Sequence, residues 1–152
     1  MISTVFIKKI SMKNLLLILA ICLTLSCKKD LDKKLTTNNW NIESAKINPA
    51  MTIGTKSSTN YLELMGPASC AATTTLTFSE DGIFTSSANG ALCDRFYDPK
   101  AAPATWSREG NQIIISSMTG SPYTIKGNKL THTTTFTSGG TTYTLVEVYK
   151  AK

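Results

Sequence analysis

The residues of this sequence that can carry acid–base chemistry are few and scattered. Its one histidine, His132, is followed by threonines, and Glu147 sits between two valines. A serine hydrolase would place such a histidine near a nucleophile on a sharp turn, yet the chain contains no Gly-x-Ser-x-Gly. Acids in loops, such as Asp94 and Asp98, usually serve solvation rather than glycoside hydrolysis. We therefore expect a protein that is not an enzyme, with His132 partly buried and paired with a neighbour.

A short basic start and an apolar run open the chain, as in a secretory signal. Residues 15–23 are nine consecutive apolar positions, about 14 Å as a helix, against roughly 30 Å for the hydrocarbon core of a bilayer. The run is too short for a membrane span and fits the h-region of a signal peptide over 1–26. Met12 is an alternative start, because Lys13 then supplies the basic region.

The cysteine after this run has the setting of a lipid-modified residue. Ser26 precedes Cys27, which resembles the lipobox of bacterial lipoproteins, whereas Cys22 follows the bulky Ile21. The resemblance implies diacylglycerol on the thiol, cleavage on its N-terminal side, and an acyl chain such as palmitate on the new amine. Residues 27–34 would then be a lipidated charged tether, and a lysine directly after the cysteine favours the outer membrane, on its periplasmic or cell-surface face. The alternative is an ordinary secretory signal.

Cleavage and lipidation would leave two cysteines, Cys70 and Cys93. An even pair in an oxidising compartment predicts a disulfide. Closing such a loop would stabilise the fold by roughly 3 kcal/mol through the unfolded chain. Two free buried thiols are the alternative. Neither a third cysteine nor a nearby histidine completes a metal site, so we expect no metal and no cofactor.

The net charge of +6 is concentrated outside the domain. Seven of the sixteen basic residues precede residue 35, and from there on nine basic residues face eight acidic ones. This small net charge predicts no basic stripe on the domain, so nucleic acid is not an expected partner. The basic residues of the tether instead favour anionic head groups, which makes a membrane the expected partner.

From residue 35 onward apolar and polar residues alternate, which is typical of β-strands. Pairs such as Asp-Gly, Gly-Asn and Gly-Gly separate the strands, so neighbours must be antiparallel. We expect a loop over 49–59 and strands over 40–47, 73–78, 83–87, 105–108, 112–117, 123–126, 129–137 and 141–150. The short apolar stretch at 61–65 is not assigned to a helix or a strand. The prediction is one all-β domain over 35–152, an antiparallel up-and-down meander of about eight strands closed into a small barrel without exposed edges.

The alternation also predicts which side chains face the barrel interior. Within 129–137 the threonines at odd positions take the outer face, because threonine is β-branched yet polar. The residues expected inside, as packed core or as the lining of a ligand cavity, are Trp40, Phe78, Phe84, Trp106, Ile113, Ile115, Tyr123 and Phe136. Barrels of about eight strands are either filled by side chains or hold one small ligand, and the sequence leaves both open.

An ordered set of motifs resembles a known family. The segment 76–84 reads Leu-x-Phe-x-x-Asp-Gly-x-Phe and is followed by Thr-Trp at 105–106, Gly-Asn at 110–111 and a final Tyr-Thr-Leu-Val-Glu-Val-Tyr strand. Over about 35–150 this is similar to the lipocalin-like domains of small Gram-negative lipoproteins. The resemblance implies a barrel that binds a small apolar or amphipathic ligand. The alternative is a scaffold or interaction protein with a packed barrel, whose long 88–103 segment would be the contact surface.

Overall fold

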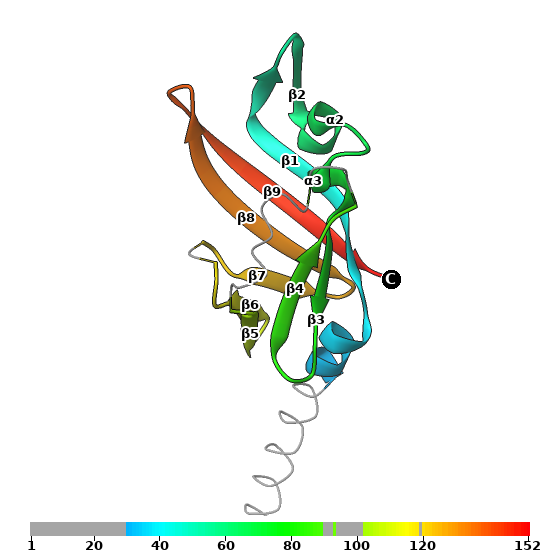
Figure 1. Cartoon of the computed structure of the whole chain (residues 1–152). Coiled ribbons are helices and arrows are strands. Elements are labelled where there is room, and N and C mark those ends of the chain that lie inside the picture. Colours follow the sequence, from blue (N-terminus) through cyan, green and yellow to red (C-terminus); the bar gives the residue numbers. More distant parts are fainter. Residues whose placement is uncertain (1–29, 90–92, 94–101, 119) are drawn as a thin grey trace, which may run out of the picture.

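Nine antiparallel strands form one sheet in the computed structural model, which describes residues 30–89, 93, 102–118 and 120–152 (Figure 1). The strand order is β2-β1-β3-β4-β5-β6-β7-β8-β9, and β1 also pairs with β9. This pairing closes eight strands into a barrel and leaves β2 outside it. The strands are β1 (Trp40–Ile53), β2 (Lys56–Asn60), β3 (Thr75–Phe78), β4 (Ile83–Ser87), β5 (Ala104–Glu109), β6 (Gln112–Ile115), β7 (Tyr123–Lys126), β8 (Lys129–Ser138) and β9 (Thr141–Ala151). The predicted all-β meander is confirmed.

Three long strands, β1, β8 and β9, make one wall of the barrel taller than the rest (Figure 1). β9 pairs with β1 from Trp40–Ala151 to Asn48–Thr144, and with β8 over its whole length. The other barrel strands have only four to six residues each. The tall wall therefore extends beyond the region that the short strands enclose.

Glycine turns set the two ends of the barrel. The β3–β4, β5–β6 and β7–β8 turns lie at the end where β1 starts and β9 finishes, because neighbouring strands are antiparallel. Gly82 and Gly127 have φ values of +86° and +61° there, which a side chain would strain. We call this the closed end, and we call the opposite end, where β8 turns into β9, the mouth.

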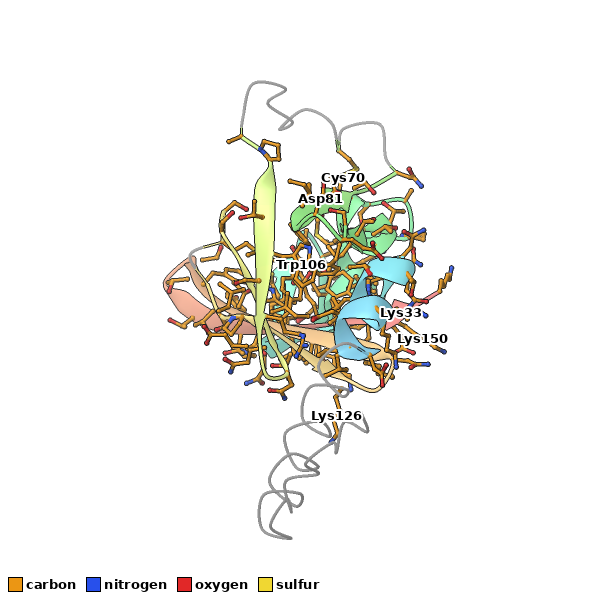
Figure 2. All side chains as sticks on the ribbon, turned by 90° about the horizontal axis from the view of Figure 1, so that it is seen from below. Lys33, Cys70, Asp81, Trp106, Lys126 and Lys150 are labelled. Atoms are coloured by element: carbon orange, nitrogen blue, oxygen red, sulfur yellow. A yellow bond between two sulfur atoms is a disulfide. The ribbon has the colours of Figure 1, made fainter. Side chains whose placement is uncertain are left out.

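A helix over residues 30–37 lies at the closed end (Figure 2, seen from below). Leu31 and Leu35 are four residues apart and so share a helix face; Leu35 is fully buried and Leu31 packs against the core. The Trp40 indole Nε1 donates to the Leu35 carbonyl oxygen over 3.1 Å. The helix thereby becomes part of the hydrophobic core.

This helix revises the tether expected over 27–34. Residues 30–34 are helical and docked, and the guanidinium of Arg108 on β5 binds the carboxylate of Asp32. Residues 27–29 lie outside the described residues. Leu31 and Leu35, at helical spacing, anchor this charged segment.

The loop expected over 49–59 is instead a hairpin. β1 runs on to Ile53, turns at Gly54 and pairs with β2. The register shifts between Lys46 and Met51, a stretch that contains Pro49; proline lacks the N–H that a regular ladder needs. This irregular stretch interrupts the alternation of apolar and polar residues. For that reason the sequence pattern did not predict that the strand continues to Ile53.

Two short helices follow the hairpin. The stretch at 61–65, which the sequence left unassigned, forms the helix α2 (Tyr61–Met65). The second helix, α3 (Cys70–Thr73), leads into β3. Asn60 and Ser69 cap them, since each side chain accepts a hydrogen bond from a backbone N–H of the first turn. No helix in the described ranges is long and apolar enough to cross a bilayer.

The closed half of the barrel is filled by side chains. Strand alternation points every second residue of β3, β6 and β7 inward, and Phe78 packs its ring 5.2 Å from Phe84 and 5.8 Å from Trp106. We call the buried cluster the floor; its members are Leu35, Trp40, Leu76, Phe78, Phe84, Ile113, Ile115, Tyr123, Ile125, Leu130 and Tyr149.

Candidate functional site

The inner face of β8 changes from fully buried to half-buried along its length. Leu130 is 0 % exposed and His132 is 7 % exposed, whereas Thr134 and Phe136 are both half-buried. Above them the Phe136 ring stacks on Tyr143 of β9, with centroids 5.6 Å apart. Along β8 full burial therefore ends at His132, and half-buried side chains follow toward the mouth, whereas Ile47 of β1, the partner of Leu145, is still buried.

A group of polar side chains lies at this boundary. His132 and Glu147 are cross-strand partners, with Nδ1 3.3 Å from Oε2. The Tyr149 hydroxyl donates to Glu147 Oε1 over 3.3 Å. The Tyr123 ring stacks on the imidazole at 4.4 Å with 20° between the planes. We call these four residues the polar cluster; as expected, the histidine is buried and paired with a neighbour.

One atom of the cluster lacks a hydrogen bond. Among the described residues, Nε2 of His132 is buried without a partner. If Nδ1 carries its hydrogen toward Glu147, a tautomer assigned from that contact, Nε2 is a bare acceptor. Leaving such an atom unpaired destabilises a protein by about 1–3 kcal/mol. Nε2 is also farther from the β8 backbone than Nδ1, so it is the part of the ring nearer the barrel axis.

The two tyrosines of the cluster are held neutral. Burial raises the pKa of Tyr123 well above its usual value, and the nearby Glu147 carboxylate raises it further. The same two causes, burial first, raise the pKa of Tyr149. Both hydroxyls therefore remain hydrogen-bond donors over the whole physiological range.

The cluster does not form a nucleophile–base–acid relay. Such a relay uses one imidazole nitrogen for the nucleophile and the other for the acid. Here the Thr134 hydroxyl, at 3.4 Å, and the Glu147 carboxylate both approach Nδ1. The described part of the chain also holds no group of three or more residues suited to a metal ion. The arrangement is suited to binding a polar group.

A hollow of about 160 Å³ lies on the side of the barrel, and Tyr123 is the one residue of the polar cluster that lines it. β6 and β7 share only two residue pairs, so the wall opens beyond Ile113 and Tyr123. Ile115 and Pro122 also line this hollow, and Tyr123 both lines it and stacks on His132. A second hollow, a groove of about 600 Å³ between the N-terminal helix and Trp106, lies at the closed end.

The eight residues expected inside the barrel fall into two groups. Trp40, Phe78, Phe84, Ile113, Ile115 and Tyr123 belong to the floor, and Trp106 packs against it. Only Phe136 lies in the mouth, stacked on Tyr143. Most of them therefore fill the barrel instead of lining a cavity.

The pairing of His132 with Glu147 was missed in the sequence, although a signal for it exists. His132 lies seven residues before Gly139, and Glu147 lies seven residues after Gly140. A two-residue turn at this glycine pair makes such positions direct partners. The turn therefore sets the register that brings the acid to the histidine.

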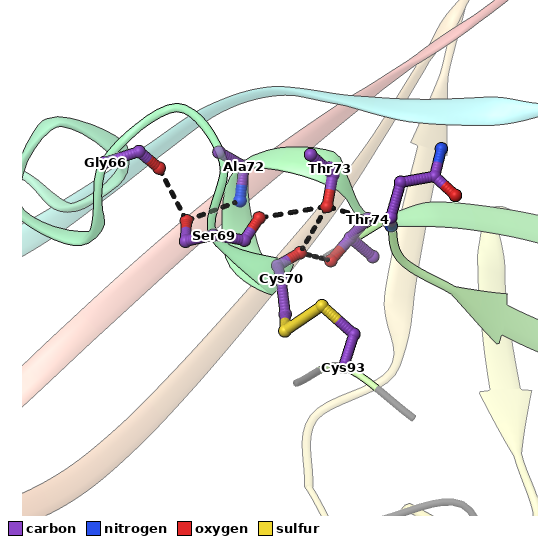
Figure 3. The surroundings of a disulfide bond; sticks show 8 residues. Gly66, Ser69, Cys70, Ala72, Thr73, Thr74 and Cys93 are labelled. Carbon is purple, nitrogen blue, oxygen red and sulfur yellow. Dashed lines mark hydrogen bonds between the residues drawn. A yellow bond between two sulfur atoms is a disulfide. The ribbon is translucent and has the colours of Figure 1, made fainter. Parts of the chain in front are cut away.

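The predicted disulfide between Cys70 and Cys93 is confirmed (Figure 3). It joins α3 to the long connection between β4 and β5, across 23 positions of sequence. Ser69 holds the start of α3, since its hydroxyl accepts from the Ala72 N–H over 3.2 Å. Most of the 88–103 segment lies outside the described residues.

Three comparisons with known proteins bear on this fold. The search of curated proteins returned no match, and neither did the search of solved structures. The family model of the lipocalin-like domain matches residues 36–150. The match covers most of the chain, nearly the whole barrel and every residue of the polar cluster. The chain belongs to the lipocalin-like domain family.

Proposed function

We propose that this protein is a lipid-anchored binding protein of the bacterial cell envelope, which takes up one small amphipathic molecule at the mouth of its barrel. The observation that carries the proposal is the pair of a buried His132 and a half-buried Glu147, placed where the packed floor gives way to the mouth. Small-molecule sites in proteins combine apolar walls with a few such polar groups. The lipocalin-like fold supports this reading.

The cluster also favours a class of ligand. Nε2 of His132 offers an acceptor, so a ligand hydroxyl can donate to it. The Glu147 carboxylate would repel a negatively charged head. Phe136, Tyr143 and Leu145 supply half-buried apolar surface above. The proposed ligand is a neutral amphiphile with a hydroxyl head, whose head displaces the side chains that now cover Nε2.

Calorimetry with decanol and decanoate tests this site. The protein would be the chain over 27–152 with Cys27→Ser, which stays free of lipid. We expect decanol to bind more tightly than decanoate. His132→Phe keeps a ring against Tyr123 and removes both nitrogens, and it should weaken decanol binding about tenfold. Thr133→Val, on the outer face of the same strand, is the control.

The variants separate the outcomes. Glu147→Gln should narrow the difference between the alcohol and the acid, because it removes the negative charge. Equal decanol affinity in His132→Phe and the unchanged protein would exclude the polar anchor. Absence of binding by either compound would exclude the ligand site.

The anchor in this proposal is Cys27. Asp30 begins the described chain at the closed end, and three residues span at most about 11 Å. Lipid on Cys27 would therefore hold the closed end close to the bilayer and leave the mouth facing water. The Cys70–Cys93 disulfide supports an oxidising compartment, and the lysine after Cys27 supports the outer membrane.

A second candidate is a scaffold lipoprotein without a ligand. The packed floor favours this second function, because buried side chains fill the closed half of the barrel where a ligand would otherwise bind. Ile53 at the tip of the β1–β2 hairpin and Met65 at the end of α2 are both 41 % exposed, which would suit contact with a protein. Failure of both decanol and decanoate to bind would favour this function over the first.

A further inference from the structure

Four lysines lie on one flank of the closed end. Lys126 and Lys129 are cross-strand partners beside the β7–β8 turn, and Lys129 is also the partner of Lys150 on β9. Lys152 follows two residues later, where its N–H donates to the Asn39 carbonyl oxygen over 2.9 Å. All four lysines are exposed. We call them the lysine flank.

The flank is only partly neutralised. Among the described residues on this side, Glu43 contacts Lys129 with Oε2 2.5 Å from Nζ. The hydrogen bond from Lys129 lowers the pKa of Glu43, and the charge of Lys150 adds to the effect. Like charges placed directly opposite each other destabilise a sheet, and the single carboxylate of Glu43 offsets only part of the repulsion between Lys129 and Lys150. A negatively charged partner would relieve it.

The chain enters at this same end. The N-terminal helix carries Lys33 and Lys34, and its first described residue, Asp30, lies three positions after Cys27 in the sequence. Figure 2, seen from below, shows Lys33, Lys126 and Lys150 at this end of the molecule. The acidic turn residues of the closed end, Glu80, Asp81 and Glu109, belong to β3–β4 and β5–β6 instead. Asp30, Asp32 and Lys33 of the helix line one groove with Glu80 and Trp106, so the acidic side of the closed end is that of β3–β6.

We propose that the lysine flank is a membrane-facing surface that binds anionic phospholipid headgroups and tilts the barrel onto its β7–β9 side. The orientation rests on the Cys27 anchor proposed above, but the surface itself can be measured without the lipid. The lipid would lie within about 11 Å of Asp30, at the same end of the barrel as the flank, and each lysine near an anionic surface strengthens binding about fivefold.

Sedimentation with vesicles tests the surface. The protein is the lipid-free chain over 27–152 with Cys27→Ser. The vesicles contain phosphatidylglycerol and phosphatidylcholine in equal parts, or phosphatidylcholine alone. We expect binding only to the anionic vesicles and a loss of binding as salt is added. Lys126→Gln with Lys150→Gln should weaken the partition about 25-fold.

A second double variant, with the same net charge as the first, serves as the control. Lys46→Gln with Lys56→Gln removes two exposed lysines from β1 and β2, away from the closed end, and should leave binding nearly unchanged. An equal loss of binding to anionic vesicles in both double variants, with melting temperatures unaltered, would show that only net charge matters. That result would overturn the proposal. Absence of binding to anionic vesicles at low salt would also overturn it. Neither result bears on decanol binding or on lipid at Cys27, which are measured separately.

Discussion

Arg108 Nε lies 2.5 Å from Asp32 Oδ1, so one ion pair joins β5 to a helix that precedes it by 76 positions in the sequence. The Arg108 side chain is only 4 % exposed, and it also donates to the Gly110 carbonyl oxygen. The pair fixes the N-terminal helix over the floor beside Leu35. It thereby fixes where the described chain enters the domain.

Loss of this pair should destabilise the fold. Asp32→Asn removes the negative charge that pairs with the nearly buried guanidinium of Arg108. The free energy of unfolding should therefore fall by about 1.5–3 kcal/mol. Asp30→Asn, at an exposed position of the same helix, is the control and should change stability little. Urea unfolding followed by circular dichroism gives both values. Equal stability of the two variants would show that the pair does not hold the helix.

The disulfide should stabilise the domain through the unfolded chain. Replacing both Cys70 and Cys93 by alanine leaves no free thiol and should lower the free energy of unfolding by about 3 kcal/mol. Reduction of the unchanged protein should have a similar effect. Thiol labelling of the native protein provides an independent check, since both cysteines should react only after reduction.

Stability should decline in alkali because of the polar cluster. Burial, and then the charge of Glu147, raise the pKa of Tyr123 and Tyr149 in the folded state. The unfolded chain therefore loses these protons first, near pH 10, and the free energy of unfolding falls as the pH rises further. Glu147→Gln should lower the pKa of both tyrosines and reduce this loss. Ultraviolet titration of tyrosinate measures it, with Glu109→Gln as a surface control.

Membrane residence should depend on one cysteine. Cys27→Ala should release the protein from the membrane fraction, because a thiol is required to receive diacylglycerol. Cys22→Ala should remain membrane-bound and carry fatty acid by mass spectrometry. Membrane residence of the Cys27→Ala protein would refute lipidation at this residue.

Local patterns were sufficient to predict most of the barrel. The alternation in 129–137 and the turn residues at Asp81-Gly82 and Gly127-Asn128 are short-range properties, and each specifies an antiparallel pair whatever its surroundings. The N-terminal helix and the β1–β2 hairpin were missed because their stability does not come from local patterns. A charged helix of about two turns and a strand interrupted by Pro49 gain their stability from what they pack against.

The sequence by itself determined the all-β meander, the inward and outward faces of its strands and the cysteine pair, because periodicity and turn chemistry act between near neighbours. Only the tertiary structure decided that seven of the eight expected interior residues fill or pack against the floor, and that Phe136 lies in the mouth. It also decided the Asp32–Arg108 pair and the contact of Tyr123 with His132. Closure of the barrel brings together strands that are distant in the chain. The size of the enclosed interior then determines which inward side chains contact each other and which stay partly exposed to water.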